Sequence, residues 1–470
     1  MFPQIEAAAA AGRTWDVVIA GSSFAAMFFL RGLPEGLSVL VVERGPVHGH
    51  EAQLESGLYP AESFRMDNSS GHPKNWVSRV LFGGNSNCWW GQVPRFLPSD
   101  FRLSEICPDA APWPLDYETI EPFYAEVEEV IEVAGGGVEH LSPRSMPYPH
   151  PPHRLCRLGA RLNEADPLNW VPVPTARANG GSRPTCCANG TCYLCPADAK
   201  FTIWNGVDKF DYPGAFLLPD TEVRRVDIAA GHTTGVEVRR SDGVRLGIAA
   251  GTVALATNAI FNTAILMRSG VKAEALGRYL HEQQSENCIL DLKDSALFGG
   301  TSIPTHGVAF RDGPFRANAG SVLIEIYNSP TLLRPEPGRQ THRALIKLIA
   351  EDLPQPQNRV FLEDDDVRIT WTGHSDYARR GLDRVAEGLI DSLPFPVDGL
   401  TRLAITETES HIQGTHRMGR DPATSVVDSM SRVHGIKGLL ALGAGVFPTS
   451  SPSNPTLTLS ALSLMAGRAL

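Results

Sequence analysis

The chain has no excess of positive charge, no long apolar run and no repeated or compositionally biased segment. Its 42 Lys and Arg residues against 52 Asp and Glu give a formal net charge of −10, which argues against a nucleic-acid partner because such proteins present a basic face. The apolar stretches, such as Ala25 to Leu30, are too short to span a membrane as a helix. Because the start has no signal-peptide pattern, we expect a cytoplasmic protein with reduced thiols.

The remaining composition is that of a folded globular protein. Apolar residues make up 42% and charged residues 20% of the 470 positions. This length is sufficient for two domains with a large core. The functional information therefore has to come from local motifs, which lie near the two ends of the chain and in one cysteine-rich run.

The first motif is a strand–helix–strand pattern near the amino terminus. Val17 to Ala20 and Val39 to Val42 are short apolar runs typical of buried parallel strands. The turn after the first run reads GSSFAA, so Gly21 is the one glycine kept from the GxGxxG fingerprint of dinucleotide-binding folds, and a helical stretch to about Leu33 follows. Glu43 ends the second run, where such folds place a ligand for a ribose hydroxyl.

The second motif lies in the carboxyl-terminal segment, which reads HIQGTHRMG and later SSPSNPTLTL. Asn is a preferred helix N-cap and Pro is favoured at the first helical position. We therefore predict that Asn454 caps a helix running from Pro455 toward Arg468. A helix amino terminus presents free N–H groups and partial positive charge, so this end would stabilise an anion.

Together these segments resemble the glucose–methanol–choline (GMC) family of flavin oxidoreductases. A third segment, LFGGNSNCWWGQVPRFLPSDF from Leu81 to Phe101, looks like that family's second flavin-binding segment. The pairing of GTHRMG with NPTLT is similar to the pyranose-oxidase and sugar-dehydrogenase branch. The matching carboxyl-terminal positions are His411, Gly414, Thr415, Met418, Gly419, 426–428, 432–435, Leu442, Gly443 and 454–456.

The resemblance implies an α/β fold with a Rossmann-like FAD-binding domain and a discontinuous α+β substrate domain. The FAD-binding domain would comprise residues 1–100, 185–275 and 405–470, with a helical and loop segment at 101–184. The substrate domain, residues 276–404, would be built on an antiparallel sheet with helices on one face. Strand-like pieces in it are 321–326, 344–350 and 367–371.

The resemblance also implies the chemistry. Neutral His411 would accept the proton of a substrate hydroxyl, Asn454 would hydrogen-bond the developing alkoxide, and hydride would pass to flavin N5. His416 is the rival for the base role. The substrate would be a small alcohol, with a sugar or glycoside hydroxyl favoured. The implied FAD-binding residues are Gly21, Ser22, Ser23, Phe24, Glu43, Arg44, Gly84, Ser86, Asn87, Cys88, Val223, Gly445, Pro455 and Thr456.

Two further segments depart from the family pattern. Cys88 stands where the pyranose-oxidase branch has a histidine bonded covalently to the flavin. A cysteinyl link and a small buried cysteine are both open interpretations. Thr257 and Asn258 replace a glycine in a strand–turn–helix that returns to the flavin, where Asn can adopt the left-handed backbone angles of a turn.

The cysteine-rich run TCCANGTCYLCPADAK contains four of the eight cysteines. Clustered thiols in a reduced compartment bind metal more often than they form disulfides. By resemblance to FAD-dependent sugar dehydrogenases with an iron–sulfur cluster, Cys186, Cys192 and Cys195 would be the ligands, although the run is one residue shorter. A zinc site that also uses Cys187, and a disulfide or free thiols, are the alternatives.

The electron acceptor depends on whether the cysteine-rich run binds an iron–sulfur cluster. With a cluster, electrons would leave singly to an acceptor protein and the enzyme would be a dehydrogenase. Without a cluster, oxygen could reoxidise the flavin directly, on a sugar or on another alcohol. A flavoprotein that carries electrons without oxidising an alcohol is a further alternative, which the pairing of His411 with Asn454 disfavours.

Overall fold

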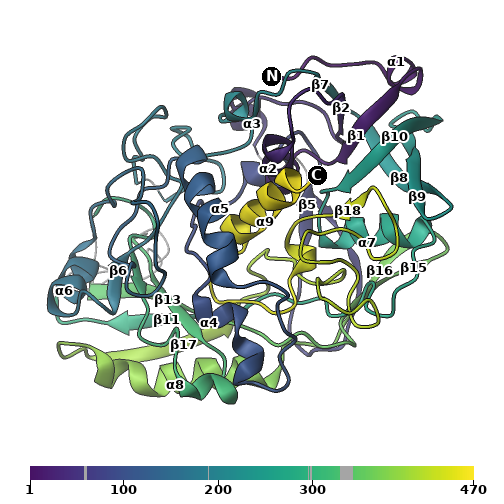
Figure 1. Ribbon diagram of the computed structural model, residues 1–470. Coiled ribbons are helices and arrows are strands. Elements are labelled where there is room, and N and C mark those ends of the chain that lie inside the picture. Colours follow the sequence, from purple (N-terminus) through teal and green to yellow (C-terminus); the bar gives the residue numbers. More distant parts are fainter. Residues whose placement is uncertain (58–60, 189, 295, 297–298, 329–341) are drawn as a thin grey trace.

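A computed structural model describes residues 1–57, 61–188, 190–294, 296, 299–328 and 342–470. Figure 1 shows two sheet-based regions, with the helices α5 and α9 near the middle and the helix α8 below the second sheet, at the bottom of the view. Within the described residues, no helix has both the length and the apolar character that crossing a bilayer requires.

The first sheet has seven strands in the order β7-β2-β1-β10-β9-β8, with β18 also paired to β10. Five of them, β7, β2, β1, β10 and β18, run parallel, and β8 and β9 extend the sheet antiparallel. Their bounds are β1 Thr14–Ala20, β2 Val39–Val42, β7 Ala215–Leu218, β8 Thr221–Ala229, β9 His232–Arg240, β10 Arg245–Leu255 and β18 Leu439–Ala441.

The helix α2 (Phe24–Gly32) connects β1 to β2, so the expected strand–helix–strand unit is present with nearly the expected bounds. The strand β2 is buried along its whole length, which explains its unbroken apolar sequence. The carboxyl-terminal helix α9 (Thr456–Arg468) packs against α2 and against α5 (Tyr117–Val130). The other helices are α1 Ala7–Ala11, α3 His50–Ser56, α4 Pro98–Phe101, α6 Arg157–Ala165, α7 Ala259–Arg268 and α8 Asp376–Ser392.

The second sheet is antiparallel, in the order β17-β11-β14-β13-β12-β6. One face packs on α8 through alternate apolar residues of its central strands. The antiparallel second sheet with a helix on one face agrees with the fold implied by the sequence. Its strands are β6 Trp170–Pro172, β11 Gln284–Asp291, β12 Thr305–Gly307, β13 Val322–Ile326, β14 Arg343–Ala350 and β17 Gly399–Ile405.

Two pairings differ from the expected arrangement. The segment 367–371 was expected in the substrate sheet, but β16 (Asp366–Trp371) pairs with β15 (Arg359–Glu363) and with β4 (Arg65–Asn68) in a separate three-stranded sheet. The strand β6, from the expected helical and loop segment, forms an edge of the second sheet. Such distant pairings leave no local sequence signal. A small ribbon of β3 (Ala61–Ser63) and β5 (Val77–Arg79) completes the sheets.

The turn after β1 requires its glycine. Gly21 has φ +100, and a Cβ there would lie 2.6 Å from the carbonyl oxygen of Ala256, which follows β10. Its N–H donates to the carbonyl of Val42 at 2.8 Å. Gly21 therefore lets three strand ends meet closely at one edge of the first sheet.

We expect Gly21→Ala to lower both the melting temperature and the FAD content of the purified protein. Left-handed strain alone would cost about 1–2 kcal/mol, and the contact with the Ala256 carbonyl adds to it. Gly36→Ala is the matched control, because Gly36 has φ +90 but open space around its Cβ position. Equal losses in the two variants, measured by thermal unfolding and flavin absorbance, would contradict this account.

Candidate active site

A cavity of about 880 Å³ lies at the carboxyl ends of the parallel strands. Its wall includes residues that directly follow each of four strands: 21–25 after β1, 43–44 after β2, 256–259 after β10 and 442–444 after β18. Ligands of open α/β sheets bind at this edge because the loops after parallel strands converge there. The cavity continues to the second sheet, so both sheets contribute to one site.

Ser22 joins the two segments expected to bind the flavin. Its Oγ donates to Glu43 Oε2 at 2.5 Å and accepts from the Gly83 N–H at 2.9 Å. The other carboxylate oxygen of Glu43 accepts from the Gly45 N–H at 2.9 Å. Burial raises the pKa of Glu43, partly offset by these hydrogen bonds. A carboxylate has about four lone-pair sites, so Glu43 can still accept from a ribose hydroxyl.

Most of the expected site residues line this cavity, but Asn87 and Gly445 do not. The Asn87 amide donates to the carbonyls of Phe82 and Gly84, so it holds the turn together. Gly445 packs against the His416 ring, and a Cβ there would collide with it. The expected residues in the wall are Gly21, Ser22, Ser23, Phe24, Glu43, Arg44, Gly84, Ser86, Cys88, Val223, His411, Asn454, Pro455 and Thr456.

The structure brings His411 and Asn454 together. Asn454 Nδ2 lies 3.5 Å from His411 Nε2, at the long limit of a hydrogen bond. On the other side of the ring, His411 Nδ1 is 3.1 Å from Gln283 Oε1. The Gln283 amide nitrogen donates to the carbonyls of Ser451 and Ser453 at 2.7 and 3.0 Å. This fixes Gln283 with its oxygen toward the ring.

The orientation of Gln283 sets the tautomer of His411. An amide oxygen can only accept, so Nδ1 must carry the proton in the neutral ring and Nε2 keeps its lone pair. Burial lowers the pKa of His411, against the opposing effects of Glu409 and Glu282. His411 is therefore a neutral base near pH 7, with its lone pair beside Asn454 in the cavity wall.

The prediction that Asn454 caps the last helix is wrong. The helix α9 begins at Thr456, Pro455 occupies the N-cap position, and no side chain caps the first turn. The Asn454 side chain is turned to His411 instead, and its Oδ1 is buried without a hydrogen-bond partner among the described residues. The first-turn N–H groups of α9 and an amide oxygen thus remain available to a ligand. By contrast, Asn258 does cap α7 and has extended, not left-handed, angles.

A buried ion pair holds the segment that carries His411. Glu282 Oε2 accepts from the N–H groups of His411 and Glu409 at 3.1 and 3.2 Å. Its Oε1 is paired with Lys74, whose ammonium lies 4.7 Å from the ring centres of Trp76 and Trp371. Burial raises the pKa of Glu282, but Lys74, His374 and Trp76 together outweigh burial, and the pKa is lowered overall. The Glu282 carboxylate therefore stays charged and fixes the His411 backbone.

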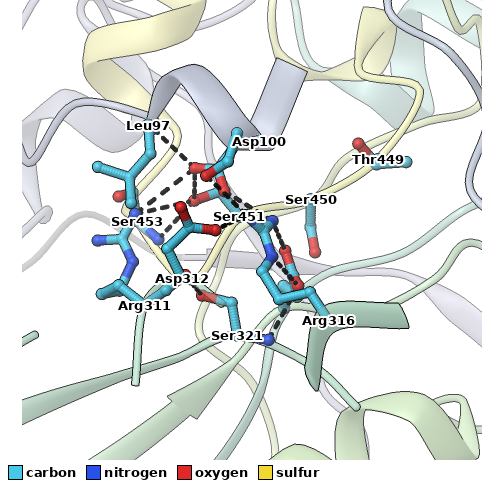
Figure 2. Close-up of polar contacts among 12 residues, drawn as sticks. Leu97, Asp100, Arg311, Asp312, Arg316, Ser321, Thr449, Ser450, Ser451 and Ser453 are labelled. Carbon is cyan, nitrogen blue, oxygen red and sulfur yellow. Dashed lines mark hydrogen bonds and ion pairs between the residues drawn. The ribbon is translucent and has the colours of Figure 1, made fainter. Parts of the chain in front are cut away.

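A second buried network holds the serine segment that contacts Gln283. Asp100 accepts from Ser451 Oγ at 2.7 Å and from Arg316 at 2.8 Å (Figure 2). Arg316 also binds Glu351 through two nitrogens. The residues Asp100 and Arg316 are almost fully buried, so removing either one would leave the charges of this network unbalanced. This network fixes the two carbonyls that orient Gln283.

His416, the rival base, is placed differently. Its Nδ1 lies 3.1 Å from Thr415 Oγ1, its ring packs on Gly445, and it is outside the cavity wall. Burial lowers the pKa of His416 to about 4. The geometry therefore favours His411 as the base.

The expected metal ligands are not gathered into one site. Cys186 Sγ lies 3.5 Å from Thr301 Oγ1, and Cys192 Sγ lies 2.9 Å from Ser302 Oγ. The described part of the chain contains no group of three His, Cys, Asp or Glu side chains placed to hold a metal ion, and all eight cysteines, including Cys195, are free thiols. The arrangement does not fit an iron–sulfur cluster or a zinc site.

Several residues of the site were missed from the sequence. Gln283 lies one residue before β11, and four further polar residues line the cavity from the second sheet or from the segment after it. Two of them interrupt apolar runs, as the glutamate in VLIEI and the lysine in ALIKLIA, which is a signal that strand alternation could have revealed. The four are Asn287, Glu325, Lys347 and Glu409.

Sequence comparison identifies the family. The model of the amino-terminal part of GMC oxidoreductases matches residues 150–285, and the model of their carboxyl-terminal part matches residues 339–463. The chain belongs to the GMC oxidoreductase family. It is therefore an oxidoreductase that acts on CH–OH groups, and its cofactor is FAD.

Relatives match over nearly the whole chain. The fructose dehydrogenase large subunit of Gluconobacter japonicus is 24% identical and covers 97% of each chain. The 6'''-hydroxyparomomycin C oxidase of Streptomyces lividus is 28% identical, over 98% of this chain and 92% of that protein. A solved structure of formate oxidase has a TM-score of 0.68 at 14% identity and covers 99% of this chain and 98% of that one, which supports the fold.

Four observations indicate that the cavity fits the FAD of a GMC oxidoreductase. Gly21 leaves room for close approach, and the first turns of both α2 and α9 have no side-chain cap. The Glu43 carboxylate stands at the end of β2, and the Asn454 oxygen is buried and unpartnered. Helix amino termini bind phosphate and other anions well.

We expect Gln283→Glu to move the acid limb of the rate of flavin reduction to higher pH. If neutral His411 is the base, the rate should fall as the pH drops through its lowered pKa. A carboxylate at Nδ1 stabilises the imidazolium and should shift this limb upward by about 1 pH unit or more. Stopped-flow reduction at a series of pH values measures it, and an unmoved limb would contradict the tautomer assignment. Gln355→Glu is the matched control, because Gln355 contacts Gly373 away from the cavity.

We expect FAD to be released free when the protein is denatured in acid. The Cys88 thiol lies in the cavity wall and its Sγ is 3.5 Å from the Asn85 carbonyl oxygen. Burial raises the pKa of Cys88, with Lys200 and Arg79 opposing, so the thiolate needed for a covalent link is suppressed. Mass spectrometry of the Cys88 peptide checks this, and a flavin-sized mass increase would refute it.

Proposed function

We propose that this GMC oxidoreductase oxidises a hydroxyl group of a sugar or glycoside, with His411 as general base and Asn454 as its partner. The observation that carries the proposal is the fixed tautomer of His411. Its lone pair at Nε2 is presented to the cavity, next to the amide of Asn454. An electron carrier would have no use for a base held in this way.

In the proposed reaction, the substrate hydroxyl donates its proton to His411 Nε2. Asn454 Nδ2 donates a hydrogen bond to the oxygen as negative charge develops on it. Gln283 keeps the proton on Nδ1 throughout, and Glu282 holds the backbone of His411 in place. FAD, when bound, supplies the acceptor for the carbinol hydride.

We propose that the cofactor contacts come from the cavity-lining residues named above. Ser22, Ser23 and the first turn of α2 would face the pyrophosphate, and Glu43 the ribose. Pro455 and Thr456, at the start of α9, would face the flavin. In the same proposal, segments 1–100, 185–275 and 405–470 form the FAD-binding domain, and 276–404 the substrate domain, to which β6 adds a strand.

The relatives support a sugar or glycoside as substrate. Among those that match over most of the chain, one is a fructose dehydrogenase subunit, one a hydroxyparomomycin oxidase and one a C-glycoside 3-oxidase. Polar side chains of the second sheet in the cavity wall suit a polyhydroxylated ligand. Bleaching of the flavin absorbance without oxygen, by a panel of sugars, glycosides and simple alcohols, tests this directly. Bleaching by simple alcohols alone would overturn the sugar assignment.

One further measurement shows whether oxygen or an acceptor protein reoxidises the flavin. The relatives include both oxidases and a dehydrogenase subunit. Because the cysteine run does not fit an iron–sulfur cluster, the proposed reaction does not use it for electron transfer. Oxygen added to the reduced protein should restore the flavin absorbance within the turnover time if the enzyme is an oxidase. Slow recovery, with fast recovery by an artificial one-electron acceptor, would identify a dehydrogenase that uses an acceptor protein.

We expect His411→Ala to slow flavin reduction by the best substrate about 100-fold or more, because a positioned base contributes about that factor. Anaerobic single-turnover kinetics measure the rate, and the flavin spectrum confirms that FAD is still bound. His416→Ala is the comparison, since its ring lies outside the cavity wall. An unchanged rate in His411→Ala, or a larger loss in His416→Ala, would remove His411 from the base role.

A further inference from the structure

A row of polar residues crosses the second sheet where it faces the cavity. His306 on β12 stands opposite Glu325 on β13, Glu325 opposite Lys347 on β14, and Lys347 opposite Asn287 on β11. Three of these four, Glu325, Lys347 and Asn287, line the cavity. Directly opposite residues in antiparallel strands point to the same face, so the row forms a continuous polar strip.

The strip is not needed to build the sheet. On the other face, the neighbouring positions of β13 and β14 are apolar, and they belong to the cluster that packs on α8: Ile324, Ile326, Ile346 and Leu348. Burying several charged groups in the middle of a sheet is unfavourable unless each is paired. A strip of this kind in a cavity wall therefore indicates ligand binding.

Glu325 is the member of the strip that lacks a full set of partners. The residue is 1% exposed, and its Oε1 has no hydrogen-bond partner among the described residues. The other oxygen, Oε2, accepts from the Tyr327 hydroxyl at 3.1 Å. Burial raises the pKa of Glu325, and Lys347, Gln92 and Tyr327 oppose this effect. An acceptor oxygen is thus buried in the cavity wall and unused.

The groups around Glu325 do not neutralise it. His306 Nε2 is 4.0 Å from Oε1, but it donates to Gln92 Oε1 at 2.9 Å, and burial lowers the pKa of His306 to about 3, so the ring is uncharged. The Lys347 ammonium is bound to Glu409 Oε1 at 2.7 Å. The described residues include no Lys or Arg in an ion pair with Glu325. This group of charges has one carboxyl more than it has cations.

We infer that the polar strip is the substrate-recognition surface and that Glu325 Oε1 accepts from a protonated amino group of an amino sugar. The inference rests on the proposed function and specifies its substrate class. An ammonium group supplies both the missing donor and the missing positive charge, whereas a neutral hydroxyl supplies the donor alone. Charge-assisted hydrogen bonds are roughly twice as strong as neutral ones, so the buried carboxyl should discriminate between the two.

The test compares Glu325→Gln with the unchanged holoenzyme on matched substrates. The probes are glucosamine and paromamine, which carry amino groups, and glucose and methyl glucoside, which do not. We expect the substitution to raise KM for the amino sugars about ten- to a hundredfold, the equivalent of one charged hydrogen bond, with kcat little changed. For the neutral sugars, KM should change less than about threefold.

Two controls separate recognition from folding. Glu286→Gln replaces a buried strand carboxylate that is bound to Arg402, outside the cavity wall, and should leave the preference for amino sugars intact. Glu325→Asp keeps the charge and should retain part of that preference. Flavin absorbance and thermal unfolding show that each variant is folded and loaded. If Glu325→Gln does not fold, the Glu325→Asp preference decides the question.

The outcomes distinguish this inference from the proposed function. A KM increase confined to amino sugars supports it. Equal effects on both substrate sets, no effect, or flavin reduction by neutral sugars alone overturns the role of Glu325 but leaves sugar oxidation standing. If no sugar of either kind reduces the flavin, the proposed function itself is wrong.

Discussion

The arrangement of the site depends on one hydrogen bond, from His411 Nδ1–H to Gln283 Oε1. It decides which ring nitrogen has a lone pair, and hence whether a base faces the cavity at all. Gln283 can play this part because its amide nitrogen is committed to the carbonyls of Ser451 and Ser453. If the amide were free to rotate, it could present a donor to the ring and leave the lone pair on the wrong side.

This bond lies where segments from both sheet regions meet. Gln283 precedes β11 of the second sheet, and the serine segment precedes α9, which packs on the first sheet's helix α2. The buried pairs of Lys74 with Glu282 and of Asp100 with Arg316 fix the backbone on either side. Buried ion pairs are a poor source of stability, but here they give a defined position to groups that must not move.

The sequence was sufficient for features encoded by neighbouring residues. The unit of β1, α2 and β2 follows from two apolar runs around a glycine turn, and strand β14 follows from a short, mostly apolar run. The sequence was insufficient where a residue distant in the chain binds a side chain that the local motif would otherwise use. Asn454 has the local pattern of a cap, yet its amide is used by His411; Asn258 has no such competitor and caps its helix. The cysteine run likewise looks local, but two of its thiols, those of Cys186 and Cys192, bond to Thr301 and Ser302, far along the chain.

The uncapped start of α9 has a thermodynamic consequence. A side-chain cap typically contributes about 1 kcal/mol to stability, and here both α9 and α2 go without one. In the proposed arrangement, the cofactor would supply the missing partners of those N–H groups, so cofactor binding would contribute part of the stability of the folded protein. Apoprotein and holoprotein should differ in stability by an amount that grows with the free flavin concentration, and a cell short of flavin would lose this protein to unfolding as well as to inactivity.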